Sequence, residues 1–282
     1  MNPIISVIIP TYNRRHVLGR AVGSVLSQRM EQFELIVVDD GSDDGSSEYL
    51  GSFDDPRLKI LVQENAGVCA ARNAGVAAST SDFLTFLDSD DEAGAGWLDF
   101  YVGAIEQRFQ LASCAVHFVG PGSLYKLVTP ETSDRAFGNV RARFLPGAFG
   151  LNKELLTSVG GFRPGLRFSE HTDLALRLGG RMIEDPFRTM STDEPLLTMH
   201  RDERPHDPAL QYESSMTLLS EDLVHLRRSR KMHSTYAAIA GVAASKLGRH
   251  DEARRMLATA IRLNPLGLKN YLRLGREVVI RP

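Results

Sequence analysis

Short apolar runs and amphipathic helical segments alternate along the first ninety residues of the chain. Residues 4–9 form a β-branched run that ends at Pro10, which predicts a fully buried strand. Apolar side chains recur at helical spacing over residues 17–28, and residues 33–38 repeat the pattern of a buried strand. A short helix is predicted at 46–51, a strand at 58–62, a small-residue helix at 68–78 and a strand at 83–87. This alternation predicts βαβ units and a mainly parallel sheet.

The rest of the chain is less regular. The pattern predicts a helix at 98–109, a strand at 112–119, and a helix that begins near Glu170 and ends at the glycine pair 179–180. From about residue 208 the pattern is almost entirely helical, with breaks near Arg230, Gly248 and residues 264–265. The expected fold class is therefore α/β, followed by a C-terminal α-helical extension.

Composition places the chain among ordinary globular proteins, with 43% hydrophobic and 24% charged residues in a length of 282. Cys69 and Cys114 lack metal-ligand spacing and are expected to be buried apolar residues. No stretch reaches the roughly 18 apolar residues of a membrane-spanning helix, and the first apolar run is too short for a signal peptide. We expect a soluble, cytoplasmic protein that does not bind nucleic acid.

Charge is distributed unevenly. From Asp222 to the end there are 13 Lys or Arg and 4 Asp or Glu, a sum of +9, so the preceding residues carry −11 of the total of −2. The basic tail is a candidate for peripheral contact with an anionic membrane surface or for a phosphate-bearing acceptor. Ordinary solvated helix faces would explain the same charge.

Polar residues follow three of the predicted strands. Residues 11–13 follow the first strand, Asp39 and Asp40 the second, and residues 88–90 the fourth. In parallel sheets ligands bind beyond the carboxyl ends of the strands, so these residues are expected to share one site.

The run Asp88-Ser89-Asp90-Asp91 places three carboxylates within four residues. Such carboxylates repel one another, and a divalent ion with oxygen ligands would relieve the repulsion. Magnesium or manganese would bind one or two of them together with the oxygens of a diphosphate. The alternative is a helix cap or a solvated loop.

Two further motifs are weaker alone. Asp39 and Asp40 could accept hydrogen bonds from a base and a ribose, or could form a turn and a helix cap with the following Gly-Ser. Gly67 could end a turn, and Arg72 in its small-residue helix could contact a phosphate or lie on the surface.

Four segments together are more specific than any one of them. ISVIIPTYNRR, VVDDGSDDGS, NAGVCAARNAG and DFLTFLDSDD, in this order and spacing, resemble glycosyltransferase family 2. The resemblance is strong over residues 4–91 and continues more loosely through LPGAFGLNKELLTSVGGFRPGLRFSEHTDLALRL. It implies a GT-A fold with a Rossmann-like, mainly parallel central sheet over residues 1–207. Residues 1–91 would be the nucleotide-binding half, 92–207 the acceptor half and 208–282 the helical extension.

The resemblance also implies an inverting, metal-dependent transfer of a sugar from a nucleoside-diphosphate donor, with UDP favoured, assisted by Mn²⁺ or Mg²⁺. Asp90 would be the main metal ligand, Asp88 would approach ribose and metal, and His200 could complete the metal shell. The remaining donor-binding residues would be Pro10, Thr11, Tyr12, Asn13, Asp39, Asp40, Asn65, Gly67, Arg72 and Ser89. The acceptors of such enzymes include lipid-linked sugars, polysaccharides, peptides and natural products.

The sequence departs from the family where the general base is expected. The usual Glu-Asp pair is replaced by Glu170-His171, with Asp173 two residues further on. His171 stands at the base position, and a neutral imidazole is a competent base near pH 7. Glu170 and Asp173 are alternatives, as is a simple helix cap or a thiol acceptor that needs less help. His206 lies in the same segment as His200, where a histidine could complete the metal shell, and is a further candidate there.

The tail from residue 234 to 265 resembles one tetratricopeptide unit, with Gly241, Gly248 and Pro265 at characteristic places. A single unit is expected to pack on its neighbours, to form a homodimer or to receive an acceptor. The rival to an enzyme is a non-catalytic nucleotide-sugar-binding scaffold that acts through this tail.

Overall fold

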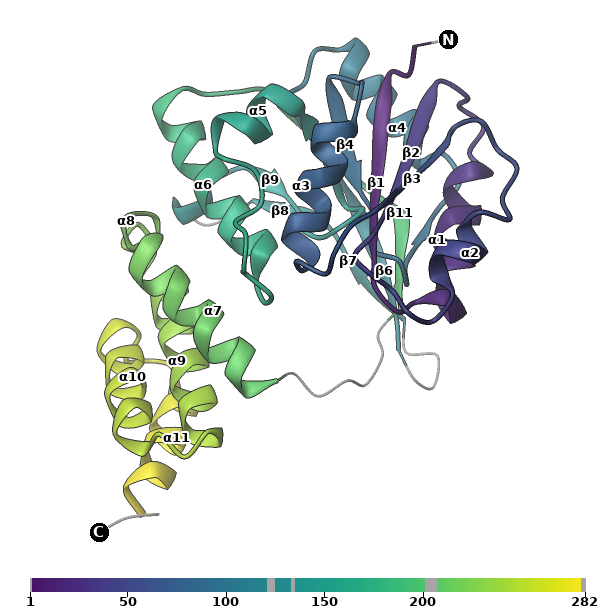
Figure 1. Cartoon of the computed structure of the whole chain (residues 1–282). Helices are drawn as coiled ribbons and strands as arrows, with labels where there is room; N and C mark the ends of the chain where they lie inside the picture. Colours follow the sequence, from purple (N-terminus) through teal and green to yellow (C-terminus); the bar gives the residue numbers. More distant parts are fainter. Residues whose placement is uncertain (1, 121–124, 133–134, 201–206, 280–282) are drawn as a thin grey trace. The chain divides into compact units, whose positions relative to one another are not determined.

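A computed structural model describes residues 2–120, 125–132, 135–200 and 207–279 (Figure 1). The chain forms two compact units, each built from several segments. The first unit comprises Met1–Ser133, Val140–Gly165 and Asp185–Glu203, and the second comprises Asp134–Asn139, Leu166–Glu184 and Arg204–Pro282. The domain boundary placed at 207/208 from the sequence stays a prediction.

The first unit is built on a large mixed sheet. Its described strands follow the order β3-β2-β1-β4-β10-β6-β11-β5, and β7 pairs with β6 outside this path. The first four are parallel, β10 is antiparallel to both neighbours, β6 and β11 are parallel, and β5 and β7 are antiparallel to their partners. The strands are β1 (Ile5–Thr11), β2 (Phe33–Asp39), β3 (Leu58–Val62), β4 (Phe83–Phe86), β5 (Glu92–Ala93), β6 (Leu111–Val119), β7 (Tyr125–Val128), β10 (Phe149–Asn152) and β11 (Thr189–His200). The mainly parallel α/β sheet expected from the sequence is confirmed.

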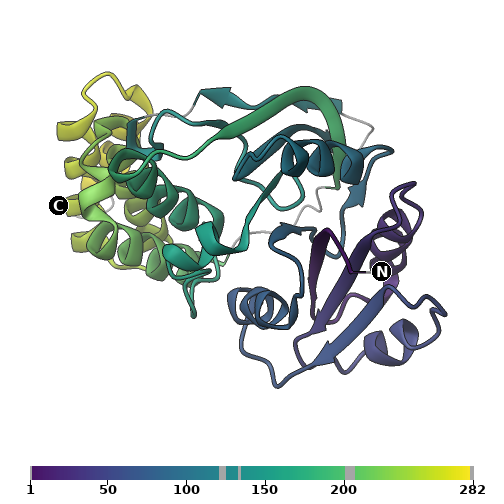
Figure 2. The ribbon, with the colours of Figure 1, turned by 90° about the horizontal axis from the view of Figure 1, so that it is seen from above.

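Helices cover both faces of this sheet. Side chains alternate between faces along a strand, and the core on one face joins Ile5, Val7 and Ile9 to helices α1 (Arg15–Leu26) and α4 (Trp97–Glu106). The opposite face receives α3 (Val68–Ala78), where a Cβ on Gly75 would lie 2.5 Å from Cγ2 of Ile8 (Figures 1 and 2). Small residues in α3 therefore allow the helix to lie directly on β1.

Shorter elements complete the first unit. They are α2 (Ser46–Leu50), α5 (Lys153–Ser158) and a two-stranded sheet of β8 (Glu131–Thr132) and β9 (Arg141–Ala142). Cys69 and Cys114 are buried and unlinked, as expected. Trp97 is fully buried in the core of the first unit and donates its indole N–H to the carbonyl oxygen of Gly147.

Pro10 does not end the first strand, contrary to the sequence-based prediction. β1 continues to Thr11, and Pro10 stays in register with Val38 of β2. On its other side, β1 pairs with β4 only as far as Ile8 opposite Phe86. A proline lacks a backbone N–H and is tolerated where a strand has no partner to bond. Pro10 occupies such a place, beyond the end of β4.

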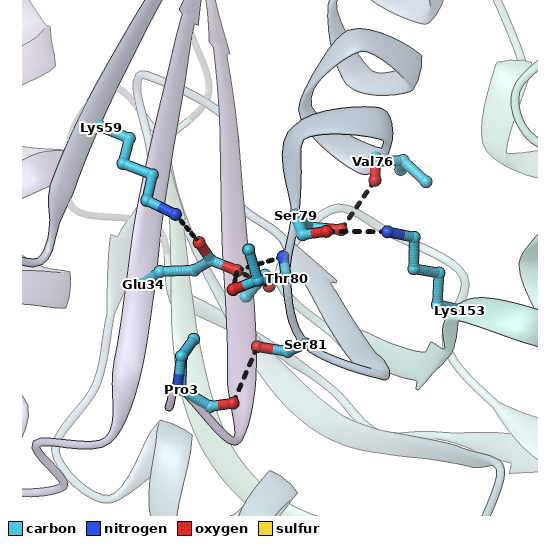
Figure 3. Close-up of polar contacts among 9 residues, drawn as sticks. Pro3, Glu34, Lys59, Val76, Ser79, Thr80, Ser81 and Lys153 are labelled. Carbon is cyan, nitrogen blue, oxygen red and sulfur yellow. Dashed lines mark hydrogen bonds and ion pairs between the residues drawn. The ribbon is translucent and has the colours of Figure 1, made fainter. Parts of the chain in front are cut away.

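A buried carboxylate joins β2 to the loop before β4 (Figure 3). Glu34 accepts hydrogen bonds from the hydroxyl of Ser6, from the backbone and hydroxyl of Thr80, and from the ammonium group of Lys59. Glu34 is only 3% exposed, so the four donors replace the water that burial removes. The network ties the loop after α3 to the amino ends of β1 and β2.

The second unit is helical in its described residues. It contains the short 3₁₀ helix η1 (Arg135–Phe137) and helices α6 (Glu170–Glu184), α7 (Pro208–Glu221), α8 (Leu223–Leu226), α9 (Arg230–Lys246), α10 (His250–Leu263) and α11 (Leu268–Val279). Small side chains let α9 and α10 approach closely, because a Cβ on Gly241 would lie 2.8 Å from Cγ of Leu257. The helical tail is confirmed, whereas its tetratricopeptide character stays a prediction. No helix in the described chain is long and apolar enough to cross a membrane.

Helix α6 does not end at Gly179 and Gly180, as predicted, but continues to Glu184. Glycine favours helix ends, yet here both glycines are in the helix interior and buried. A Cβ on Gly179 would lie 2.4 Å from Cα of Phe137, and one on Gly180 would lie 2.3 Å from the ring of His225. Both glycines are therefore needed for close packing inside the second unit.

Candidate active site

Three neighbouring parallel strands carry the predicted polar residues to one edge of the sheet. β1 ends at Thr11, its neighbour β2 ends at Asp39, and the acidic loop at 88–91 follows β4 on the other side of β1. The expected gathering of these residues at the carboxyl ends of the strands is therefore seen in the first unit.

Asp39 organises the turn after β2. Its Oδ1 accepts the backbone N–H of Ser42 at 2.9 Å, and its Oδ2 accepts the hydroxyl of Ser47. Asn13 links this turn to β1, because its N–H donates to the Ser42 hydroxyl and its side-chain oxygen accepts the N–H of Asp43. Asn13 has a φ of 52°, a conformation that Asn tolerates better than most residues. Hydrogen bonds therefore join the loop after β1 to the loop after β2.

Asp40 organises the loop that leads into α3. Its Oδ1 accepts from the amide of Gln63 at 2.7 Å and from the N–H of Ala66, and its Oδ2 accepts the N–H of Gly67 at 2.8 Å. Gly67 has a φ of 89°, which favours glycine at the start of the helix. Asp39 and Asp40 are both buried and occupied by protein donors. Their predicted contacts with base and ribose stay predictions.

Other predicted donor-binding residues differ in exposure. Tyr12 is 48% exposed and Asn65 is exposed, so both side chains are accessible to a ligand. Thr11 is buried, and its hydroxyl has no hydrogen-bond partner among the described residues. Pro10 and Ser89 are buried, which leaves mainly their backbone for any direct contact.

Arg72 is buried on α3 and directed to the acidic loop. Its Nη2 donates to Oδ1 of Asp88 at 2.8 Å, and its guanidinium lies over the ring of Phe162 at 5.2 Å. Arg72 is only 1% exposed, whereas the Asp88 side chain is 30% exposed. The buried arginine thus positions Asp88, and the Asp88 carboxylate remains accessible to solvent.

Carboxylate oxygens of Asp88, Asp90 and Asp91 lie within 4.8 Å of one another. Asp91 is buried, and its Oδ2 has no hydrogen-bond partner in the described chain. Burial and the neighbouring charges of Asp88 and Asp90 raise the pKa of Asp91 to about 9. Asp90 contributes its carbonyl oxygen to Arg20 and lies 3.8 Å from Nη1 of Arg14. An all-oxygen cluster with an unsatisfied buried carboxylate fits a hard divalent cation.

His200 lies beside this cluster. Its backbone N–H donates to Oδ1 of Asp91 at 3.0 Å, and its buried Nε2 lies 3.7 Å from Oε2 of Glu92. The imidazole is not part of the group of ligand atoms within 4.8 Å. Its role as a metal ligand stays a prediction, and His206 lies outside the described residues.

The three candidate bases belong to the second unit and lie in the first turn of α6. Nδ1 of His171 is 3.2 Å from Oε1 of Glu170, and His171 is largely buried. Asp173 is fully buried, and its Oδ2 accepts from Nε of Arg177 at 3.0 Å and also from Nη2. Glu170 is therefore the most exposed of the three and Asp173 the most enclosed.

Sequence reasoning missed two features of this site. The acidic run predicts a metal site without singling out Asp91, although Asp91 holds the unsatisfied oxygen. The sequence signal for Asp91 is its place as the third carboxylate of the run. Arg14 and Arg20 approach Asp90 from the loop and helix after β1, and no local pattern pointed to those contacts.

Comparisons with known proteins converge on one family. The model of "Glycosyl transferase family 2" matches residues 6–170. The chain is 42% identical over 137 residues to glycosyltransferase GlyA of Streptococcus pneumoniae, a match that covers 48% of this chain and 16% of that protein. It is 39% identical over 89 residues to the UDP-Glc:alpha-D-GlcNAc-diphosphoundecaprenol beta-1,3-glucosyltransferase WfgD of Escherichia coli, covering 31% and 35%. The matches thus span well under two thirds of these relatives.

A similar architecture occurs in the crystal structure of S. aureus TarS 1-349 in complex with UDP-GlcNAc. The TM-score is 0.68 at 17% identity, and the match covers 93% of this chain and 81% of that one. At this identity the likeness concerns the fold, which is the GT-A arrangement expected from the sequence.

Proposed function

The chain belongs to glycosyl transferase family 2, and from that premise we propose that it transfers a sugar from a UDP-sugar to an acceptor hydroxyl with inversion. The observation that carries the proposal is the cluster of Asp88, Asp90 and Asp91 at the carboxyl edge of the parallel strands. TarS, which shares the fold, was crystallised with UDP-GlcNAc, and the name of WfgD includes a UDP-glucose donor.

Asp88, Asp90 and Asp91 are the residues that would hold Mn²⁺ or Mg²⁺. The bound ion would neutralise the negative charge that develops on the departing nucleoside diphosphate. The orphaned Oδ2 of Asp91 supports this assignment, because a buried carboxylate oxygen without a donor is costly in the absence of a cation.

The protein's own groups would perform the remaining tasks. Tyr12 offers an exposed aromatic ring at the end of β1 for the base, and Asn65 offers an exposed amide at the start of the α3 loop. Asp39 and Asp40 shape the two loops around that position through their hydrogen bonds to Ser42 and Gly67. Arg72 holds Asp88 in place, and a group in the first turn of α6 would accept the proton of the acceptor hydroxyl.

The acceptor belongs to one of the classes expected from the sequence, with a sugar carried on a lipid diphosphate as the first to test. The name of WfgD includes an acceptor of this class. The basic tail of this chain would suit a phosphate-bearing acceptor. The comparisons do not favour a non-catalytic scaffold.

The experiment is release of UDP from a panel of UDP-sugars, with and without acceptors, in the presence of Mn²⁺, Mg²⁺ or a chelator. We expect Asp90→Asn to lower turnover by about 100-fold or more, because the charge on the leaving group would lose its partner. Asp82→Asn is the matched control, since Asp82 is an exposed carboxylate just before the opposite end of β4.

Two outcomes would overturn the proposal. One is undiminished metal-dependent turnover in Asp90→Asn. The other is saturable binding of UDP-sugars without transfer or hydrolysis across the whole acceptor panel, which would reinstate the scaffold. Anomeric configuration of the product, measured by NMR coupling constants, tests inversion separately.

A further inference from the structure

Helix α11 carries its apolar side chains outward. Leu268 is 74% exposed and Leu272 is 72% exposed, and Tyr271 and Val278 are also exposed. Successive residues of a helix are rotated by about 100°, which places these side chains on one broad face. Leu266, just before the helix, is a further large apolar side chain that is 89% exposed. A solvent-facing helix normally has the opposite arrangement, with its apolar stripe turned to the core.

The inward face of α11 is polar and anchored. Glu277 is buried and accepts from the hydroxyl of Ser245 on α9 and from Nδ1 of His250 on α10. Asn270, seven residues earlier on the same face, is also buried. These contacts set the rotation of the helix about its axis, so the outward apolar face is a fixed feature of the second unit.

A row of cations borders the apolar face. Lys269, Arg273 and Arg276 are exposed, and they lie between the inward polar face and the outward apolar face. Glu277 is the single acidic residue of α11, and it is buried. The exposed charge of the helix is therefore entirely positive.

The surrounding tail adds to this charge. Four acidic residues follow position 221, and two of them, Asp222 and Glu277, are buried. The other two form ion pairs: Asp251 lies 2.5 Å from Arg254, and Glu252 lies 3.8 Å from Arg249. A second copy of this helix would bring one cationic row against another, which like-charge repulsion disfavours. The charge pattern is complementary to an anionic surface that can also receive apolar side chains.

We propose that α11 is a membrane-interface helix, which lies on an anionic lipid bilayer with Leu268 and Leu272 in the boundary between headgroups and acyl chains. A helix with a strongly basic flank and exposed leucines on the other face binds in this way. Its 12 residues cover about 18 Å along the surface and do not span the bilayer. Contact with lipid would keep the full chain at the surface where lipid-linked molecules are found.

The test is flotation of the full chain with phosphatidylcholine vesicles that contain or lack phosphatidylglycerol. We expect binding to the anionic vesicles only, weakened by added salt because the charged contacts are exposed. The double variant Leu268→Glu/Leu272→Glu should reduce the partition coefficient by at least about tenfold. Val224→Glu is the matched control, because Val224 is 67% exposed on α8, and its partition should stay close to that of the unchanged protein.

A second variant separates lipid binding from misfolding. Lys269→Gln/Arg273→Gln/Arg276→Gln alters only exposed positions and should lower partition onto anionic vesicles by about fivefold for each charge removed. Circular dichroism should show unchanged helix content. Equal binding by all variants, or no vesicle binding by the unchanged protein, would overturn the proposal. Sedimentation that shows a dimer broken by Leu272→Glu, without vesicle binding, would assign the face to a second copy instead.

Discussion

Arg72 and Asp88 form a 2.8 Å ion pair that joins α3, on one face of the sheet, to the acidic loop after β4. The pair is asymmetric, because the arginine is almost fully enclosed while the aspartate reaches solvent. An arginine in this position limits the conformations of Asp88 and keeps one of its oxygens engaged. Asp88 can then present its other oxygen to a ligand.

We expect Arg72→Lys to weaken metal-dependent UDP binding by about tenfold, as changes to groups that orient metal ligands commonly do. Lysine keeps the charge but loses the planar contact with Phe162 and the fixed geometry of the guanidinium. Thermal shift with Mn²⁺ and UDP would measure the binding. The melting temperature without ligand is the internal control, since a purely structural role would lower it and leave the relative metal affinity unchanged.

Glu34 should make the protein sensitive to acid. Burial alone would raise the pKa of Glu34, but hydrogen bonds from Lys59, Ser6 and Thr80 outweigh it and lower the pKa from 4.5 to about 2. Its stabilising contribution is therefore present above pH 4.5 and is lost as the pH falls toward 2. The full effect on the free energy of unfolding is about 3 kcal/mol.

Glu34→Gln should remove most of that contribution at pH 7 and flatten the pH dependence of stability between about pH 5 and pH 2. Urea unfolding at a series of pH values would measure it. Lys59→Met is the comparison, because the Lys59 side chain is 47% exposed and its loss should cost only about 1 kcal/mol. Parallel pH curves for Glu34→Gln and the unchanged protein would contradict the assignment.

Local pattern was sufficient for the elements of the first ninety residues. The predicted strand at 58–62 and helix at 68–78 match β3 and α3. Their signals are the periodicity of the segment and the polar residues directly beside it, and both can be found in the local sequence. Strand β11 was not predicted, since its partners Leu111 and Ala93 are distant in sequence. The network of Glu34 with Thr80 was equally beyond local reasoning, whereas the acidic run was found at once because its carboxylates are adjacent.

The two glycines of α6 show the limit of local signals most clearly. Glycine is a helix terminator when its backbone is left-handed and a packing residue when a neighbour approaches closely, and the sequence looks the same in both cases. Only the positions of Phe137 and His225 decide between the two.

Gly179→Ala should destabilise the second unit by about 3 kcal/mol or more, because the added Cβ would meet the backbone of Phe137, which cannot rotate away. Gly180→Ala should cost less, since the obstacle is the side chain of His225. Gly103→Ala, in the interior of α4 with nothing near its Cβ, should instead stabilise by about 0.5–1 kcal/mol. Denaturant unfolding would rank the three, and a Gly179→Ala protein as stable as Gly103→Ala would show that α6 is not packed on η1 in this way.

The identity of the general base can be narrowed by the contacts of α6. Asp173 is fully enclosed and bonded to Arg177, so we expect Asp173→Asn to lower stability by about 1–3 kcal/mol and to leave the pH optimum in place. His171 stands at the base position, and Glu170, 3.2 Å from its Nδ1, would orient the imidazole. We expect His171→Ala to reduce kcat by at least about tenfold and to abolish the acidic limb of the pH–rate profile.

Glu170→Gln distinguishes support from direct action. If Glu170 only orients His171, its amide should lower kcat severalfold and keep a bell-shaped profile, whereas a base at Glu170 would lose that limb altogether. Rates with a thiol acceptor provide a control, since a thiol ionises more readily and depends less on a base. Turnover within tenfold of the unchanged protein in all three variants would show that no residue of this turn removes the proton from the acceptor.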